Sequence, residues 1–132
     1  MKKLLMVLPF LVSTTVLASS STVTRLDQPT FIPKNRTMTF YSHHEYHVTN
    51  DSESVQSFNV CFTMTSCPEW QYYVKSTKTC TTLQLSPHQA VNDRRDMTLN
   101  VNYPFTGWCH LVATTEVNNA VSSQDTKQFQ VG

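Results

Sequence analysis

The fold is decided between Phe58 and Cys80, where the sequence reads FNVCFTMTSCPEWQYYVKSTKTC. This stretch holds three of the four cysteines and one of the two tryptophans. From Ser57 to Thr65, apolar and polar residues alternate with the period of a β-strand. One side carries Phe58, Val60, Phe62 and Met64, and the other carries Asn59, Cys61, Thr63 and Thr65. We expect this strand in the middle of a small β-sandwich, with its apolar side in the core.

Similar short strand patterns recur along the rest of the chain. Strands are expected at residues 22–26, 30–32, 37–41 continuing through 45–49, 57–65, 70–74, 79–85, 97–101, 108–117 and 126–131, the second of them as an edge or entry segment. Turns are expected at 50–53, 75–78 and 118–125, a charged loop at 92–96 and one helical turn at 87–91. Strands about every ten residues are typical of an all-β sandwich.

The N-terminus has the three parts of a secretory signal peptide. Lys2 and Lys3 precede an apolar run, and Val16-Leu17-Ala18 offers a cleavage site after Ala18. We therefore expect a signal peptide at 1–18, a single domain at 19–132, and a periplasmic or secreted protein with no membrane span after cleavage. Without Lys2 and Lys3 the chain has eight basic and nine acidic residues. Nucleic acid is excluded as an expected partner because no basic stripe exists.

Three motifs together resemble the immunoglobulin-like domains of bacterial envelope proteins, the PapD-like and Hydin-like group. They are Tyr46–Asn50 at a strand end, Leu83–Gln89 before a strand, and Leu99–Pro104 with Gly107 following. The resemblance covers residues 37–117 and implies an immunoglobulin-like sandwich of about seven to eight antiparallel strands. His88 stands where the group usually has glycine. The second domain and the basic cleft of pilus chaperones are missing, so the resemblance does not imply that activity.

Four cysteines in an exported chain predict two disulfides, and three pairings are possible. We favour Cys67–Cys80 with Cys61–Cys109, which closes a short loop and ties the middle of the chain to its last main strand. The alternative is Cys61–Cys80 with Cys67–Cys109, because Cys61 and Cys80 share the polar side of their strands. The cysteines lack a CxxC arrangement, so we expect staples and not a redox centre.

The sequence His43-His44-Glu45-Tyr46-His47 is the segment most suggestive of chemistry. On a strand, His43, Glu45 and His47 share one face at steps of roughly 6.5–7 Å. Two imidazoles and a carboxylate are ligands that Zn²⁺ or Cu²⁺ accepts. The alternative is a solvated polar strand face. No resident cofactor is otherwise indicated.

Large aromatic residues gather in two segments expected near loops. These candidate partner-binding residues are Trp70, Tyr72, Tyr73, Tyr103, Phe105 and Trp108. They could form core or an exposed patch that binds another protein. An enzyme is not expected, because the chain has no GxSxG motif, only two glycines for a phosphate loop, and singly placed carboxylates.

The leading hypothesis is an exported, non-enzymatic domain that binds another protein as a small subunit of an envelope or secretion assembly. Pairing at a sheet edge is one expected contact mode. The second hypothesis is a periplasmic Zn²⁺ or Cu²⁺ binder that uses His43, Glu45 and His47. The third is a secreted inhibitor or effector that uses the aromatic loops.

Overall fold

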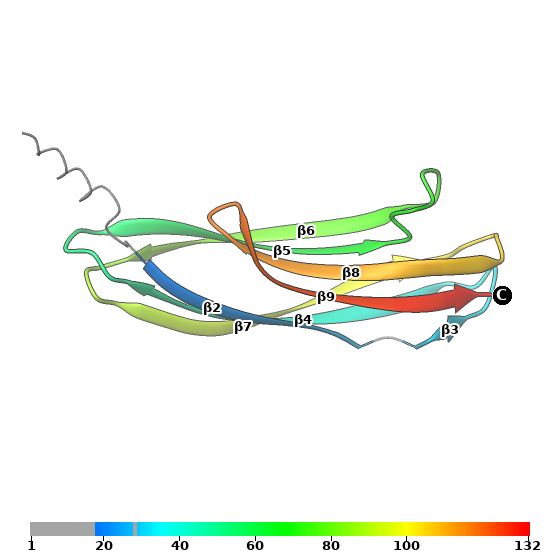
Figure 1. Ribbon diagram of the computed structural model, residues 1–132, viewed down its shortest axis with the longest axis horizontal. Coiled ribbons are helices and arrows are strands. Elements are labelled where there is room, and N and C mark those ends of the chain that lie inside the picture. Colours follow the sequence, from blue (N-terminus) through cyan, green and yellow to red (C-terminus); the bar gives the residue numbers. More distant parts are fainter. Residues whose placement is uncertain (1–17, 28) are drawn as a thin grey trace, which may run out of the picture.

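The computed structural model describes residues 18–27 and 29–132 (Figure 1). Its strands run along the long axis of the molecule in two layers. They are β2 (Ala18–Asp27), β3 (Phe31–Ile32), β4 (Met38–Asn50), β5 (Gln56–Ser66), β6 (Lys75–Leu85), β7 (Ala90–Val101), β8 (Gly107–Val117) and β9 (Ala120–Val131). The expected signal peptide at 1–18 lies outside the described residues except for Ala18. No helix in the described ranges is long and apolar enough to cross a membrane.

The strand order is that of an immunoglobulin-like sandwich. One sheet has the order β2-β4-β7, and the other has the order β3-β9-β8-β5-β6. Immunoglobulin domains place strands A, B and E in one sheet and C, F and G in the other. Here β2, β4 and β7 occupy the first set of positions, and β5, β8 and β9 occupy the second. Strand β6 extends the second sheet beside β5, as C′ does in variable-type domains. The predicted fold class is confirmed, except that the two-residue β3 runs parallel to β9.

The core forms where the inward faces of the two sheets meet. The predicted inward residues of β5 are confirmed, since Phe58, Val60, Phe62 and Met64 are all buried. The opposite sheet supplies Phe40, Tyr46 and Val48 from β4, and Met97, Leu99 and Val101 from β7. This alternation follows from the strand period, which sends successive side chains to opposite faces.

The disulfide pairing corrects our favoured expectation. Cys61 is bonded to Cys80, and Cys67 is bonded to Cys109. The pairing of Cys67 with Cys80 is wrong because residues 75–78 are not a turn but the start of β6. Strand β6 therefore pairs with β5 over its full length and brings Cys80 directly opposite Cys61. The first disulfide joins the neighbouring strands β5 and β6, and the second joins the residue that follows β5 to β8.

The expected aromatic strand at 70–74 is also wrong, because these residues form tight turns between β5 and β6. The N–H of Trp70 donates to the carbonyl of Cys67 at 3.1 Å, and the N–H of Tyr73 donates to the carbonyl of Trp70 at 2.8 Å. The aromatic side chains here fill space beneath a loop, a role that strand propensity does not distinguish from a sheet face.

The expected helical turn at 87–91 is a β-turn. The N–H of Gln89 donates to the carbonyl of Ser86 at 3.0 Å. His88 has a φ of 64°, the left-handed conformation that the third residue of a type II turn requires. A residue with positive φ cannot continue an α-helix. The glycine usual at this position in the resembled group would adopt the same conformation without a side-chain penalty.

Two expected loops are largely strand. Residues 92–96 lie within β7, an edge strand whose charged side chains face solvent, so the charges do not mark a loop. The polar turn expected at 118–125 shrinks to Asn118 and Asn119, with φ values of 51° and 68°. Positive φ at both central residues is the requirement of a two-residue type I′ hairpin.

Candidate functional site

One end of the sandwich gathers four separate chain segments. The loop between β5 and β6, the connection from β7 to β8, the short β3 and the C-terminus all lie at the right of Figure 1. We call the first of these the Cys67–Val74 loop. Its base is fixed by the disulfide to Cys109 and by a 2.9 Å hydrogen bond from the Cys67 N–H to the His110 carbonyl. The loop is therefore attached covalently to β8 as well as to β5.

The far side of this loop rests on an aromatic stack. The ring of Trp70 lies parallel to that of Phe105, with centroids 4.1 Å apart and an interplanar angle of 11°. Tyr73 and Tyr103 also pack on Phe105, at 4.9 and 5.2 Å. The hydroxyl of Tyr103 donates to Ser66 Oγ at 2.7 Å, which satisfies the polar atom of this buried ring. Such pairs stabilise a structure beyond the area they bury.

A polar pair, Glu69 and His110, also attaches the loop to β8. Glu69 accepts from His110 Nδ1 at 2.7 Å and from the His110 backbone N–H at 3.3 Å. Partial burial would raise the pKa of Glu69, but hydrogen bonds from its own backbone and from His110 outweigh that effect and lower the pKa. The carboxylate is thus held charged against the start of β8.

The structure divides the six candidate aromatic residues into two groups. Trp70, Tyr73, Tyr103 and Phe105 pack on one another, and Tyr103 is fully buried. Tyr72 is 89% exposed and Trp108 is 54% exposed. Of these six residues, Tyr72 and Trp108 are therefore the two most open to a partner, while the other four support the loop that carries Tyr72.

The three candidate metal ligands lie on the outer face of the three-stranded sheet. His43, Glu45 and His47 alternate with buried residues along β4, so they share a face as predicted. His43 Nδ1 lies 2.9 Å from Asp96 on β7, and His43 Nε2 lies 4.0 Å from Asp27 on β2. Hydrogen bonds from Arg94 and His43 lower the pKa of Asp96 to about 2. This face therefore carries hydrogen-bonded polar side chains and the exposed ion pair between Arg94 and Asp96.

The structure does not bring these three residues together as a metal site. Nowhere in residues 18–27 and 29–132 do three His, Cys, Asp or Glu side chains come close enough to hold a metal ion. Zinc needs its ligand atoms about 2 Å away, and His43 is turned toward Asp96 and Asp27 instead. The metal hypothesis stays a prediction that would need these side chains to move.

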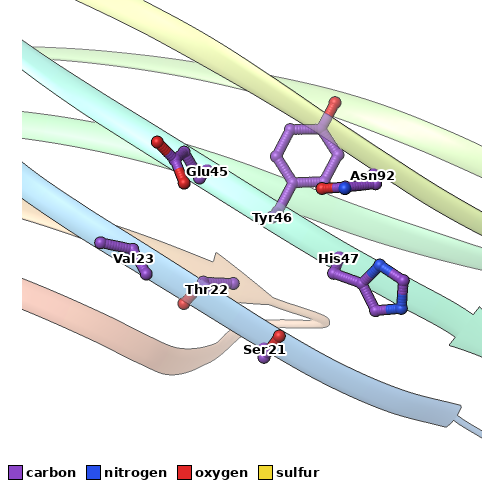
Figure 2. A pocket seen from close by; sticks show the side chains of 7 residues that line it. All are labelled: Ser21, Thr22, Val23, Glu45, Tyr46, His47 and Asn92. Atoms are coloured by element: carbon purple, nitrogen blue, oxygen red, sulfur yellow. The ribbon is translucent and has the colours of Figure 1, made fainter.

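A shallow depression of about 100 Å³ lies beside them, between β2 and β4. Figure 2 shows the Glu45 carboxylate and the His47 ring on β4, one on either side of Tyr46. The lining is completed by Ser21, Thr22, Val23 and Asn92. Small-molecule sites usually enclose about 300–1,000 Å³, so this depression is too small to surround a typical ligand.

The sequence interpretation missed His44, which is fully buried between the sheets. Its Nε2 lies 2.8 Å from Ser42 Oγ, and its Nδ1 lies 2.8 Å from Thr115 Oγ1. Burial, with a smaller contribution from His43 and against an opposing effect of Asp96, lowers the pKa of His44 to about 4. Because no solvent reaches the ring, this neutral histidine holds the sheets together and does not meet a substrate. The sequence signal that could have found it is the strand period, which places His44 on the same inward face of β4 as Phe40 and Val48.

A second missed residue, Asn50, joins two of the motifs that carried the family resemblance. Asn50 ends β4, is fully buried, and donates from Nδ2 to the carbonyls of Leu85 and Ser86 at 3.0 and 3.1 Å. Its backbone carbonyl accepts from the His88 N–H at 2.8 Å. The strand-end motif and the Leu83–Gln89 motif therefore meet in space and stabilise the opposite end of the sandwich.

Comparison with known proteins identifies no family, since no family model and no curated protein matches. Solved structures with a similar fold include the alkylpurine DNA glycosylase AlkC of Pseudomonas fluorescens bound to abasic-site DNA (TM-score 0.49, 11% identity, 92% of this chain and 32% of that chain). Another is a β-glucosidase of Listeria innocua, with a TM-score of 0.43, 12% identity, and coverage of 86% of this chain and 16% of that chain. A third is the CARDB domain of a Pyrococcus furiosus protein in complex with di-metal ions, with a TM-score of 0.38, 18% identity, and coverage of 89% of this chain and 97% of that chain.

This chain thus spans about a third of the glycosylase or less than a fifth of the glucosidase. At these identities and TM-scores the likenesses carry no functional argument, and the fold assignment rests on the strand order described above. The chain is an immunoglobulin-like β-sandwich with two disulfides.

Proposed function

We propose that this protein is an exported, non-enzymatic domain that binds another protein through the end of the sandwich carrying the Cys67–Val74 loop. One observation carries the proposal. Tyr72 is 89% exposed although the loop beneath it is fixed by a disulfide, two turns and an aromatic stack. Tyrosine is among the residues most enriched at the binding anchors of protein interfaces.

The rigidity of the loop matters because binding must offset the entropy lost when surface groups are ordered. A loop already fixed in one conformation loses little of that entropy, so more of the contact energy appears as affinity. Tyrosine suits this position because its large ring has few rotatable bonds and its hydroxyl can make a hydrogen bond. Trp108, on the adjoining face of β8, would extend the contact area.

The absence of an enzyme activity is part of the proposal and has two supports. The depression beside Glu45 and His47 holds only about 100 Å³. His44, whose pKa is lowered to about 4, is sealed between the sheets by Ser42 and Thr115. The depression is too small to enclose a typical substrate, and the ring of His44 is not accessible to one.

Export to the periplasm or the outside of a bacterial cell is supported by the N-terminal sequence and by the two disulfides, which persist in oxidising compartments. The resemblance to PapD-like and Hydin-like domains, whose first two motifs meet at Asn50, favours a small subunit of an envelope or secretion assembly. A secreted inhibitor or effector would use the same loop, and the nature of the captured protein separates these alternatives.

Affinity capture with three baits tests the proposal. The mature wild-type protein, Tyr72→Ala and Tyr41→Ala are immobilised, and envelope and medium fractions of the producing cell are passed over each. Tyr41 is the matched control, since it is a 48% exposed tyrosine on the outer face of the other sheet. We expect a protein that wild type and Tyr41→Ala retain and Tyr72→Ala loses. Identical captured sets, or none, would contradict the proposal.

A further inference from the structure

Strand β6 is a long edge of the five-stranded sheet. It pairs with β5 in one unbroken register, from Gln56 opposite Leu85 to Ser66 opposite Lys75. On its other side it has no partner strand within residues 18–27 and 29–132. The backbone groups on that side are therefore free to pair with another strand, which proteins ordinarily prevent by specific devices.

The other edges of the sandwich carry such devices and β6 largely lacks them. Strand β7 has four consecutive charged residues, Asp93 to Asp96, and β3 is only two residues long. Strand β2 is tied across to β9, where Thr22 Oγ1 bonds Ser122 and Ser123 at 2.8 and 2.6 Å. Strand β6 contains neither proline nor a register shift, and its only charges are Lys75 and Lys78.

The orientation of the β6 backbone follows from the pair at its midpoint. Cys61 and Cys80 are directly opposite, with Cα atoms 4.0 Å apart. That separation fits a non-hydrogen-bonded pair, about 4.5 Å, better than a hydrogen-bonded pair, about 5.5 Å. Asn59, in the same phase of β5, turns its carbonyl away from β6 to accept from the Asn118 N–H at 2.8 Å. The N–H and C=O of Cys80 therefore point to the open edge.

The same alternation applies along the whole strand. Every second residue directs its backbone N–H and C=O outward, and these residues are Ser76, Lys78, Cys80, Thr82 and Gln84. The disulfide at the centre holds them in line with β5. Strand β6 thus offers a row of outward donors and acceptors whose ordering is already complete before a partner arrives.

We propose that β6 is a self-association edge, on which a second copy of this chain pairs antiparallel through its own β6. A two-fold axis at Cys80 pairs all eleven residues of the strand, because Cys80 is the midpoint of Lys75–Leu85. Residues with outward groups then face one another, with Lys78 opposite Thr82 and Ser76 opposite Gln84. The contact is isologous, as a two-fold interface requires.

In this register, the side chains of one β6 strand are compatible with those that they face on the other copy. Lys78 meets Thr82 and Lys75 meets Leu85, so no two lysines oppose each other. Thr79 of one copy meets Thr81 of the other, and threonine pairs across strands are favourable. A two-fold axis at Lys78 would instead place two lysines directly opposite, which is unfavourable. Of these two registers, the sequence of β6 favours the one centred on Cys80, which pairs the whole strand with itself and supports a second copy as the occupant.

Pairing of this kind would join two five-stranded sheets into one continuous sheet. Each Cys67–Val74 loop immediately precedes β6, and antiparallel pairing sends the two loops to opposite ends of the interface. Their attachment points would be separated by roughly 33 Å, the length of ten strand residues. This consequence alone rests on the proposed function: the dimer would present two copies of Tyr72, and avidity would strengthen binding to a partner with repeated sites.

Sedimentation velocity of the mature protein over a range of concentrations tests the proposal. We expect a concentration-dependent dimer for wild type and for Thr82→Val, which keeps the N–H and the branched shape. Thr82→Pro removes an outward N–H but none of the bonds to β5, so it should be monomeric with an unchanged circular dichroism spectrum. A wild type that stays monomeric at every concentration, or a Thr82→Pro variant that dimerises as well as wild type, would overturn the proposal.

A second pair of variants tests the register of the two β6 strands. Neither variant introduces a proline, so the result does not depend on whether the strand tolerates one. Thr82→Glu places a carboxylate opposite Lys78 of the partner twice in the dimer, and should tighten association by about fivefold. Thr82→Lys places like charges there and should weaken it by about the same factor. Equal dissociation constants for these two variants would contradict the register. Because no binding partner is used, failure here is distinguishable from failure of the Tyr72 capture experiment.

Discussion

Trp70 lies flat against Phe105, with ring centroids 4.1 Å apart, and so connects the loop that follows β5 to the segment that precedes β8. Because the same loop is bonded through Cys67 to Cys109, it is held at both its base and its middle. This double attachment keeps Tyr72 in place while leaving it in solvent. The loop therefore acts as a rigid support for one exposed ring.

Replacement of Trp70 tests this support. Trp70→Ala should lower the free energy of unfolding by about 2 kcal/mol, less than for a fully buried tryptophan because the ring is only half-buried. It should also speed amide exchange at residues 69–74. Trp108→Ala is the control, since Trp108 is 54% exposed and should cost less than about 1 kcal/mol. Equal losses in urea titrations of the two variants would show that the stack does not hold the loop.

Stability should depend on pH through His44. The folded protein keeps this buried ring neutral, with a pKa of about 4 against 6.5 in the unfolded chain. The unfolded state therefore binds the extra proton first, and stability is complete above pH 6.5 and falls as the pH drops toward 4. The loss should approach about 3 kcal/mol at the lower end of this window.

Urea midpoints of wild type and His44→Gln between pH 4 and 7.5 measure this effect. The variant keeps an amide for Ser42 and Thr115 but has no titrating ring, so its stability should change less across the window. Asp96, whose pKa is lowered to about 2, stabilises the folded protein above its ordinary pKa of 3.8. That contribution is lost mainly below pH 3.8, outside the window of His44. Parallel pH profiles for the two proteins would assign the dependence to other groups.

Asn50 should be among the most sensitive polar residues. Asn50→Ala leaves the buried carbonyl of Leu85 and its neighbours without a donor, which should cost about 3 kcal/mol. Asn50→Asp should be equally damaging, because it keeps the acceptor but loses the donor. The exposed Asn92 provides the control, and Asn92→Ala should change stability by less than about 0.5 kcal/mol in thermal or urea unfolding. Similar values for Asn50→Ala and Asn92→Ala would refute the role given to Asn50.

The two disulfides should differ in both contribution and access. They close loops with sequence separations of 19 and 42 residues. In the chain-entropy description, serine replacement of Cys61 and Cys80 should cost about 3 kcal/mol, and replacement of Cys67 and Cys109 about 4 kcal/mol. Limiting reductant followed by alkylation and mass spectrometry should label the exposed Cys80 before the buried Cys109. The reverse order of labelling would contradict this assignment.

The structure makes a prediction against the metal hypothesis. Since His43 is engaged with Asp96 and the described residues hold no group of three His, Cys, Asp or Glu side chains close enough to bind a metal ion, we expect Zn²⁺ and Cu²⁺ to bind no more tightly than micromolar. Calorimetric titration of wild type, His43→Ala and His47→Ala measures this. Submicromolar affinity that both variants lose would instead establish His43, Glu45 and His47 as a metal site.

Strand periodicity predicted the fold where one face of a strand is buried. Phe58 to Met64 alternate cleanly because β5 has core on one side only, and the inward residues follow directly. The charged stretch at 92–96 was misread because an exposed edge strand and a loop both expose charged side chains. Residues 70–74 were misread because the aromatic rings that fill the end of a sandwich have the same composition as a strand.

The candidate site was predictable only in part, since it depends on contacts between distant segments. The sequence identified the six aromatic residues, but which four would pack together is decided when residues 67–74 meet residues 103–108. The disulfide pairing likewise follows from β6 extending back to Lys75, which shifts Cys80 opposite Cys61. His44 and Asn50 are buried polar residues whose partners, Thr115 and Leu85, lie far along the chain.

The central claim is that Tyr72 on its rigid loop is the main contact with a partner protein. Calorimetric titration of the captured partner with wild type, Tyr72→Ala and Tyr41→Ala tests it most directly. We predict that Tyr72→Ala raises the dissociation constant at least about thirtyfold, which corresponds to the loss of about 2 kcal/mol of binding free energy. The dissociation constant of Tyr41→Ala should stay within about twofold of wild type. A Tyr72→Ala variant that binds as tightly as wild type would contradict the account.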